Sequence, residues 1–383
     1  MNPHQRIYLD HAATTPLCSE AREAMIRCLT DVPGNASGIY ASAREAKRHL
    51  EAARAQAASI LHAYPDELYF TSGGSESDNW ALKGIAFRAG TGSHIVTTMI
   101  EHPAVLNTCR YLEKLGHPVT YLRPDARGRI DPSDIRRALR PDTAIVSVMW
   151  ANNEIGTVEP VSGIAGITRE AGIPFHTDAV QAAGTLEIDL HSAGVDLLSL
   201  SAHKFYGPKG VGLLYLRRGL GIEPLIHGGE QERGLRASTE NVAGAAGLAA
   251  ALAVAEKRRT EEHSRLSGLR DLLYERLRQE LPDIILNGDI KERLPGNLHL
   301  TIPGTDDKTL IPLLDLNGVE ASAGSACTAG SFVESHVLKA IGVPSELLRG
   351  SLRLTLGRDT DEQDVLEAAA RITATVRQLR SSH

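Results

Sequence analysis

Two short segments of the chain decide its fold: His176-Thr177-Asp178-Ala179-Val180-Gln181 and Ser201-Ala202-His203-Lys204. Each follows a short apolar run, so each is expected at the end of a buried strand. They bring a carboxylate, Asp178, and an amine, Lys204, to the same edge of one sheet. This pair suits pyridoxal phosphate (PLP), because Lys204 can hold the cofactor as a Schiff base while Asp178 keeps its ring nitrogen protonated.

Short apolar runs alternate with helical patterns between residues 68 and 215. Several runs are apolar without alternation, which is typical of strands covered on both faces. Intervening stretches such as 77–88 and 103–114 are long enough for crossover helices. The pattern predicts an α/β fold with a mostly parallel seven-stranded sheet, in which the last strand runs antiparallel. The predicted strands are 68–71, 94–97, 119–122, 144–149, 174–177, 197–200 and 211–215.

The rest of the chain predicts a smaller α+β domain. A long helical stretch covers residues 240–281, and its second half carries an amphipathic stripe from Leu266 to Leu277. A strand at 296–302 and a helix at 361–379 follow. The boundary between the domains is therefore expected inside the long helix. The expected domains are 16–258, which is the large PLP-binding domain, and 1–15 with 259–383, which form the small domain.

Composition narrows the class of protein. A chain of 383 residues is long enough for two domains, and its 23% charged and 42% hydrophobic residues are ordinary for a globular enzyme. A formal net charge of −6 gives no support to direct nucleic-acid binding over a broad surface. The sequence has neither an apolar signal core nor a run long enough to span a membrane, so we expect a cytoplasmic protein.

The four cysteines form no C-x-x-C pair, so neither a metal site nor a disulfide framework is expected. Cys28 and Cys109 follow apolar residues and are expected to be structural thiols. Cys327 differs, because it lies between the small residues of Gly324-Ser325-Ala326 and Thr328-Ala329-Gly330. Small neighbours leave a thiol accessible. On these residues alone a reactive thiol and a structural thiol stay equally open.

Polar residues follow three further predicted strands. Thr71-Ser72-Gly73-Gly74-Ser75-Glu76 opens a helix, where free amides attract a phosphate, or it is an ordinary turn with Ser75 as N-cap. His102 can stack on a planar cofactor or move protons, or it caps the next helix. Asn152 and Asn153 are either turn residues or ligand donors. Because open α/β sheets bind ligands at the carboxyl ends of their strands, five such ends together predict a binding site.

In these motifs the chain resembles the NifS/IscS-type cysteine desulfurases, which are PLP-dependent transferases of fold type I. The resemblance runs from Tyr8-Leu9-Asp10-His11-Ala12-Ala13-Thr14-Thr15 to Arg353-Leu354-Thr355-Leu356-Gly357. It also rests on Ser201-Ala202-His203-Lys204, Asn152-Asn153-Glu154-Ile155-Gly156 and Gly324-Ser325-Ala326-Cys327-Thr328. Such an enzyme converts L-cysteine to L-alanine, holds the sulfur as a persulfide and passes it to an acceptor protein.

The resemblance also implies roles for individual residues. Lys204 carries the cofactor and removes the α-proton of the substrate, His102 stacks on the ring and moves protons, and Cys327 is the nucleophile. Asp178 contacts the ring nitrogen, and Gln181 and Asn153 address the ring hydroxyl. The phosphate meets Gly74, Ser75, Ser201 and His203, and Thr239 reaches the phosphate of a neighbouring subunit. The substrate meets Asn35, Asn153 and Arg353, whose guanidinium suits a carboxylate through two parallel hydrogen bonds. The assignment of Thr239 implies a homodimer with shared active sites.

Three segments depart from the family pattern. Asn35-Ala36-Ser37-Gly38-Ile39-Tyr40 stands where the family usually has Asn-Pro-Ser-Ser-x-His, and Gly228-Gly229-Glu230 lacks a third glycine. Ala237-Ser238-Thr239 replaces Ser-Gly-Thr. These changes leave the acceptor open, so iron–sulfur assembly competes with dedicated pathways such as DNA phosphorothioation, tRNA thiolation or thio-cofactor synthesis.

Other functions remain open on the sequence. A selenocysteine lyase or a PLP β-eliminating lyase needs no persulfide on Cys327, and a sulfur-relay scaffold needs no turnover. The segment 324–336 offers a further expectation, because its extended contour is about 40 Å at roughly 3.3–3.6 Å per residue. We expect it to be weakly ordered, or to rest with Cys327 far from the cofactor.

Overall fold

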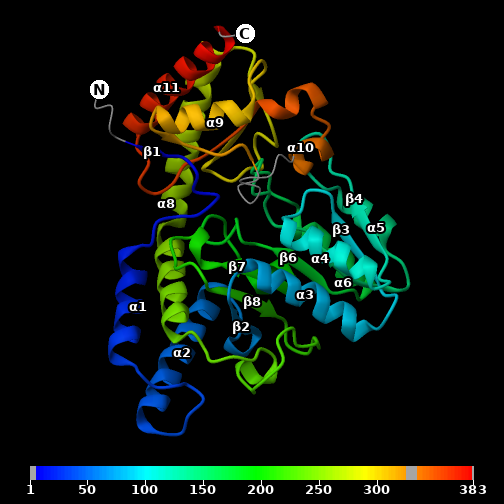
Figure 1. The fold of residues 1–383 in the computed structure, drawn as a ribbon. Coiled ribbons are helices and arrows are strands. Elements are labelled where there is room, and N and C mark those ends of the chain that lie inside the picture. The colour runs from blue at the N-terminus through cyan, green and yellow to red at the C-terminus, as the bar shows by residue number, and fades with distance from the viewer. Residues whose placement is uncertain (1–5, 325–333, 382–383) are drawn as a thin grey trace.

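The computed structural model describes residues 6–324 and 334–381. Its larger half contains a seven-stranded sheet in the order β2-β8-β7-β6-β5-β3-β4 (Figure 1). The strands are β2 (Leu68–Thr71), β3 (His94–Thr98), β4 (Val119–Leu122), β5 (Thr143–Ser147), β6 (Phe175–Asp178), β7 (Leu197–Ser201) and β8 (Gly212–Leu216). β8 is antiparallel to β7 and β2, and the other pairs are parallel. The predicted mostly parallel sheet with a reversed last strand is confirmed.

The largest difference from the predicted strands is at the end of β5. The prediction continued to Met149, whereas regular pairing stops at Ser147. The backbone nevertheless stays bonded to β6, because Val148 N donates to His176 O at 3.1 Å and Trp150 N donates to Asp178 O at 2.8 Å. The apolar run thus extends past the ladder, and its end remains fixed beside Asp178.

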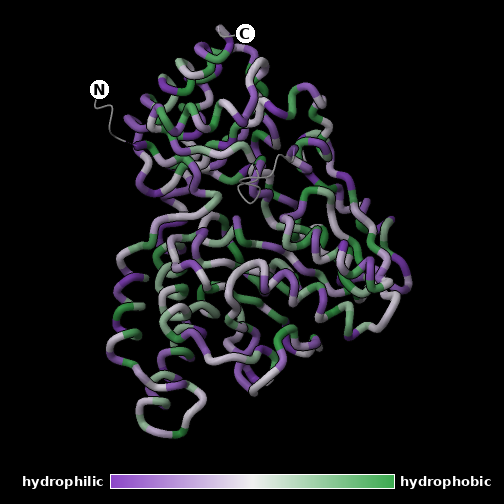
Figure 2. The backbone as a smooth tube through the Cα atoms, viewed as in Figure 1, coloured by the Kyte–Doolittle hydropathy of each residue, from purple (hydrophilic) through white to green (hydrophobic). Residues whose placement is uncertain are grey.

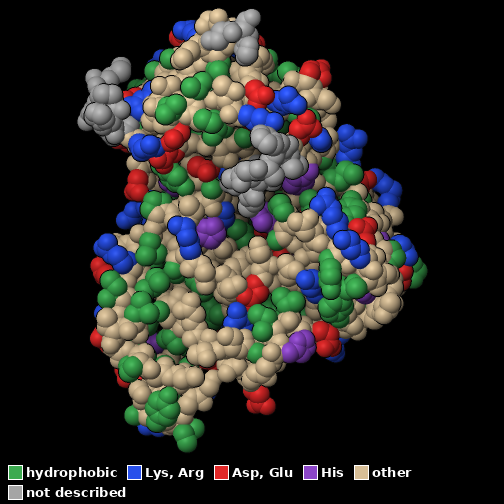
Figure 3. Space-filling model, in the orientation of Figure 1, with side chains coloured by type: hydrophobic (Ala, Val, Ile, Leu, Met, Phe, Trp, Pro, Cys, Tyr) green, Lys and Arg blue, Asp and Glu red, His purple; other side chains and the backbone are tan. Residues whose placement is uncertain are grey.

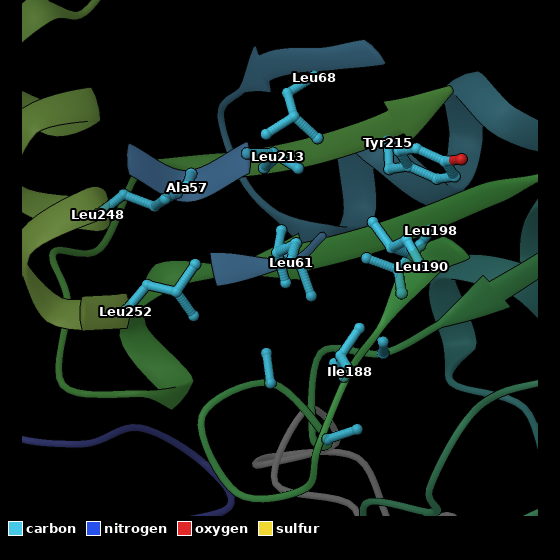
Figure 4. Close-up of a cluster of buried hydrophobic side chains, with 14 of the residues drawn as sticks. Ala57, Leu61, Leu68, Ile188, Leu190, Leu198, Leu213, Tyr215, Leu248 and Leu252 are labelled. Carbon is cyan, nitrogen blue, oxygen red and sulfur yellow. The ribbon is translucent and has the colours of Figure 1, made fainter. Parts of the chain in front are cut away.

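Helices cover both faces of the sheet, which explains why its strands are apolar without alternation. One face packs on α3 (Gly74–Ala89) and α4 (Pro103–Lys114). The other packs on α2 (Ala41–Ile60), α5 (Pro132–Ala138), α6 (Val161–Ala171), α7 (Leu190–Ala193) and the start of α8. Neighbouring residues point to opposite faces, so Leu197 joins the first cluster and Leu198 the second. Figure 4 shows Leu198 and Leu213 of the second cluster beside Leu61 and Leu190.

The helix α8 (Val242–Glu280) joins the two halves of the molecule. Its first half is rich in Ala and Gly, and residues such as Leu248 and Leu252 pack in the cluster behind the large sheet. Its second half places Leu266, Leu273 and Leu277 in a separate cluster. One continuous helix therefore contributes to two cores, as the sequence predicted.

The smaller half holds two further sheets, in the orders β12-β10-β9 and β1-β11. Their strands are β1 (Ile7–Tyr8), β9 (Ile285–Leu286), β10 (Asn297–Thr301), β11 (Val319–Glu320) and β12 (Ser351–Thr355). The helices here are α9 (Asp307–Leu316), α10 (His336–Ala340) and α11 (Glu362–Ser381), whereas α1 (Ser19–Asp31) packs on the first half of α8. Ile7 and Leu9 belong to the same hydrophobic cluster as the C-terminal strands. This arrangement agrees with a small domain that includes the N-terminus, although the domain boundaries themselves stay a prediction.

Figure 2 shows hydrophilic and hydrophobic residues interspersed along the chain in both halves, with hydrophilic residues along the outer helices. Among the described residues, no helix combines the length and the apolar character needed to cross a lipid bilayer.

A buried ion pair fixes the segment that leads to Thr239. The side chain of Arg54 on α2 donates to both carboxylate oxygens of Glu232, at 2.8 and 2.7 Å, and to Leu68 O at 2.7 Å. Glu232 also accepts a hydrogen bond from Phe70 N at 3.0 Å. Arg54 is 2% exposed and Glu232 is 6% exposed. Two well-paired charges therefore tie this segment to strand β2.

Replacing Arg54 with alanine is expected to lower the free energy of unfolding by about 3–5 kcal/mol, because Glu232 would remain buried without its partner. Urea denaturation of the purified variant measures this change. Arg136→Ala provides the matched control, since Arg136 pairs with Glu170 at 2.8 Å on the surface, where such a pair contributes about 0–1 kcal/mol. Equal losses in the two variants would contradict this account.

Candidate active site

A cavity of about 330 Å³ lies at the carboxyl ends of the parallel strands. Figure 3 shows histidine side chains at the waist of the molecule, between its larger and smaller halves. Of the residues predicted from the sequence, those that line this cavity are Gly74, Ser75, His102, Asn153, Asp178, Gln181, Ser201, His203, Lys204 and Arg353. Asn35 and Thr239 are exposed and are not among the lining residues, and Cys327 lies outside the described part of the chain.

Lys204 ends the short helix η2 (Ala202–Lys204), which follows β7 directly. Its Nζ donates to Ala12 O at 2.5 Å and to Ala13 O at 2.7 Å. The neighbouring His203 places Nδ1 3.1 Å from Thr14 Oγ1. The N-terminal segment therefore forms one wall of the cavity and holds the amine. Sequence reasoning missed this wall, because backbone carbonyls leave no signal in side-chain patterns.

Asp178 is the last residue of β6 and is 5% exposed. Its Oδ1 accepts a hydrogen bond from Val180 N at 2.9 Å. Burial raises the pKa of Asp178 to about 6, against the opposing effects of that hydrogen bond and of the Lys204 charge. Gln181, three residues on, donates through Nε2 to Ala12 O at 3.0 Å. Both side chains therefore face the wall that also holds the amine.

The helix α3 begins in this cavity, with Gly73 as its N-cap. The alternative in which Ser75 is the N-cap is therefore wrong, because Ser75 already lies in the first turn. A Cβ on Gly74 would lie 2.7 Å from Val180 Cγ2 and 3.6 Å from Ser201 Cβ, so only glycine fits there without displacement. The first amides of a helix have no acceptor within it and attract anions. Ser201 adds a hydroxyl beside them.

His102 caps the next helix and also lines the cavity. Its Nδ1 accepts a hydrogen bond from Ala104 N at 3.1 Å, so it caps α4, and its ring lines the cavity. Burial, followed by the charges of Lys204 and His336, lowers the pKa of His102 to about 4. The ring is therefore neutral near pH 7, and a neutral ring can lie against a planar ligand without adding charge.

The two asparagines after β5 have different roles. Asn152 is fully buried and is a turn residue, since its Oδ1 accepts from Glu154 N at 2.9 Å and from Ile155 N at 3.0 Å. Asn153 lines the cavity. Glu154 Oε2 accepts a hydrogen bond from Ser335 Oγ at 2.5 Å and would lie 3.0 Å from a Cβ on Gly324. The described residues on both sides of the segment that contains Cys327 therefore lie beside this turn.

Arg353 on β12 is 1% exposed and lines the cavity from the smaller half. Its Nη2 donates to Asp10 Oδ1 at 2.8 Å, and its Nη1 donates to Asn153 O at 2.9 Å. Its Nε has no hydrogen-bond partner among the described residues. The sequence singled out Arg353 but did not predict Asp10 as its partner. The pair orients the guanidinium, whose remaining donor capacity suits a carboxylate.

Replacing Arg353 with lysine is expected to raise KM for cysteine by roughly 10–100-fold, because one charge-assisted hydrogen bond contributes about 1.5–3 kcal/mol. In the predicted role Arg353 would bind the carboxylate of the substrate away from the reacting bonds, so the turnover number should change less than KM. Steady-state kinetics separate the two constants. Arg349→Lys, at an exposed position four residues earlier, should leave both unchanged. An unchanged KM in Arg353→Lys would contradict a role for Arg353 in binding the substrate.

The donor set of the cavity fits PLP. Lys204 offers an amine, Asp178 a carboxylate, and the start of α3 with Ser201 and His203 offers donors for a phosphate. The buried Asp78, which the sequence did not single out, also lines the cavity, and its Oδ1 has no hydrogen-bond partner in the described structure. An unpartnered buried oxygen is costly unless a ligand or a proton satisfies it.

The two cysteines expected to be structural are buried. Cys28 is 5% exposed and Cys109 is fully buried, and burial raises the pKa of both thiols. A thiol held in its neutral form is a poor nucleophile, so neither competes with Cys327 for that role.

Comparisons with known proteins point to one family. Residues 7–367 match the family described as aminotransferase class-V. A cysteine desulfurase IscS from Dictyoglomus turgidum is 49% identical over 362 residues, which cover 94% of this chain and 92% of that protein. A cysteine desulfurase IscS from Methanosarcina thermophila is 47% identical, over 99% of this chain and 94% of that protein.

A solved structure described as a NifS-like protein superposes with a TM-score of 0.92 at 36% identity, covering 98% of this chain and all of the other. The sheet order, the lysine after β7 and the match along nearly the whole chain point to one assignment. The chain belongs to the aminotransferase class-V family of PLP-dependent enzymes, among the NifS- and IscS-type cysteine desulfurases.

Proposed function

We propose that this protein converts L-cysteine to L-alanine and keeps the sulfur as a persulfide on Cys327 before an acceptor protein takes it. The observation that carries the proposal is the cavity itself, which brings together Lys204 of η2, Asp178 of β6 and Arg353 of β12. The described flanks of the Cys327 segment, at Gly324 and Ser335, meet Glu154 next to this cavity. A related solved structure, with 38% identity and a TM-score of 0.81, is described as SspA in complex with cysteine, which supports cysteine as the substrate.

Each residue then has one task. Arg353 binds the carboxylate of cysteine and fixes its orientation in the cavity. Lys204 takes the proton from the α-carbon, and later returns protons to the product. PLP, when bound, supplies a sink for the electrons left at that carbon. Asp178 would balance the positive charge of the bound cofactor's ring nitrogen, and the neutral His102 would lie against its ring.

Sulfur transfer requires a second nucleophile. The Cys327 thiolate attacks the sulfur of the substrate, so a sulfur–sulfur bond forms while the carbon–sulfur bond breaks. The electron pair of the broken bond stays with carbon, which is protonated at that position and becomes the methyl group of alanine. The atoms balance as cysteine plus thiol giving alanine plus persulfide, and no external oxidant is needed.

We also infer a homodimer with shared active sites. Asn35 and Thr239 do not line the cavity of their own chain, but their segments adjoin, because Ser37 Oγ lies 3.4 Å from the carboxylate of Glu240. Ile39 beside them is 89% exposed, which is costly for a large apolar side chain unless a partner covers it. Sedimentation equilibrium tests the dimer, and a monomer that is fully active would contradict it.

The nature of the product distinguishes the possible functions. Wild-type protein loaded with PLP is given cysteine without reductant, and alanine, pyruvate and protein-bound persulfide are measured after one turnover. A desulfurase yields one alanine for each persulfide, whereas a β-eliminating lyase yields pyruvate, ammonia and free sulfide. A scaffold yields none of them. A much higher kcat/KM for selenocysteine than for cysteine would favour the selenocysteine lyase. The acceptor protein, its pathway and a cytoplasmic location stay predictions.

A further inference from the structure

Asp78 is a buried carboxyl group that the proposed roles do not use. It lies on α3, is 1% exposed and lines the same cavity as Asp178. Asp78, His102 and Asp178 each place one polar atom within 4.8 Å of the others. Two carboxylates this close in a buried site cannot both be ionised without a large electrostatic cost. One proton must therefore be held on the pair, and its position decides where the negative charge lies.

The groups behind Asp78 offer no positive charge to stabilise its ionised form. His176 Nε2 lies 3.6 Å from Asp78 Oδ1, but burial lowers the pKa of His176 to about 3, so the ring is neutral. His176 is bonded on both sides to hydroxyls, Ser147 Oγ at 2.8 Å and Ser199 Oγ at 3.0 Å. Asp78 also shares a hydrogen bond with Ser199. This side of the carboxyl group thus offers dipoles and no positive charge.

The groups in front of Asp78 act in the same direction. Burial raises the pKa of Asp78 well above its ordinary value, and the charge of Asp178 raises it further, whereas the hydrogen bond with Ser199 lowers it by less than either. The charge of Lys204, in contrast, lowers the pKa of Asp178. The amine therefore favours ionisation of Asp178 and leaves the proton to Asp78.

We infer that Asp78 is a positioning residue that holds a proton beside Asp178, so that the single negative charge of the pair stays on Asp178. This inference deepens the proposed function, because it assumes that the cofactor ring nitrogen faces Asp178. A neutral Asp78 satisfies its unpartnered Oδ1 with a proton and keeps a second negative charge away from the ring. An ionised Asp78 would compete with Asp178 for the proton of the ring nitrogen.

Two variants separate a proton-holding role from a charged one. Asp78→Asn has nearly the same shape, offers N–H donors and cannot ionise, so its dissociation constant for PLP should stay within about twofold of wild type. Asp78→Ala removes the proton-bearing group and leaves its space beside Asp178 empty, so it should bind PLP roughly 10-fold more weakly, about the net loss of one ordinary hydrogen bond. Apo-protein is titrated with PLP, and the absorbance of the bound cofactor is followed as a function of pH. Arg88→Ala, exposed on the same helix, is the matched control.

Infrared spectroscopy detects the proton directly and needs only the asparagine variant. Wild-type apo-protein at neutral pH should show a carbonyl-stretch absorption from protonated Asp78, and Asp78→Asn should lack that contribution. Burial raises the pKa of Glu101 and of Glu159 to about 8, so their absorption remains in both proteins and serves as an internal reference.

The outcomes are distinct. An unchanged infrared spectrum, or PLP affinity in Asp78→Asn as low as in Asp78→Ala, would overturn the inference, as would unchanged affinity in Asp78→Ala. Failure of the wild-type protein to bind PLP would instead contradict the proposed function. The inference is supported when wild-type and asparagine proteins bind alike, the alanine variant binds more weakly, and the absorption from Asp78 is lost.

Discussion

Lys204→Ala is expected to reduce the rate of alanine formation by about 10⁴-fold, the upper end of what a general base contributes. In the proposed mechanism the variant removes the amine that takes the α-proton, and no other lysine lines the cavity among the described residues. The two carbonyls of Ala12 and Ala13 that hold this amine would be left in place, so the fold should survive. Alanine release under saturating cysteine measures the loss.

A second readout tests the covalent role of the same residue. After borohydride reduction and denaturation, wild-type protein should retain the cofactor and Lys204→Ala should release it. Lys209→Ala is the matched control, since Lys209 is exposed five residues later on the same loop and should leave both readouts unchanged. Lys204→Ala with a tenth or more of wild-type activity would exclude this lysine as the base.

Cys327→Ser is expected to reduce persulfide formation at least about 10³-fold, because a hydroxyl stays protonated where a thiol ionises and attacks sulfur. Proton exchange at the α-carbon should persist, since that step belongs to Lys204. Incubation in deuterated buffer separates the two variants, because Cys327→Ser should still exchange the α-proton of cysteine and Lys204→Ala should not. Mass spectrometry of the recovered substrate records the exchange.

Cys18→Ser is the control for the general loss of a thiol, because Cys18 is partly exposed while Cys28 and Cys109 are buried. It should form persulfide on Cys327 at the wild-type rate. Equal alanine production by wild type and Cys327→Ser would contradict the persulfide mechanism and favour the lyase function. This result is independent of Lys204, so the two predictions can fail separately.

The sequence predicted the sheet and most of the cavity for one reason. Strands buried on both faces must be apolar throughout, so their ends are easy to recognise, and the residues just beyond them meet at one edge. Gly74, His102, Asp178 and Lys204 were all found in this way. Asn152 and Asn153 could not be separated, because only the fold decides which amide completes the turn.

The rest of the site depends on contacts that have no local signal. Asp78 looks like an ordinary polar residue in a helix, and only tertiary packing reduces its exposure to 1%. Asp10 pairs with Arg353 across almost the whole chain, and the carbonyls that hold Lys204 belong to two alanines. The pairing of Arg54 with Glu232 was likewise invisible, because a charged pair in a sequence is usually a solvated one.

The helix α8 has a consequence for how this protein can vary. It runs without a break for 39 residues and contributes to both hydrophobic cores. Each added residue would turn one core against the other by about 100° and advance it by about 1.5 Å. The helix passes from one core to the other between Ala255 and Leu266. A single insertion or deletion there would displace Arg353 relative to Lys204. The length of this segment therefore sets the relative position of Arg353 and Lys204, even though none of its residues needs to touch the substrate.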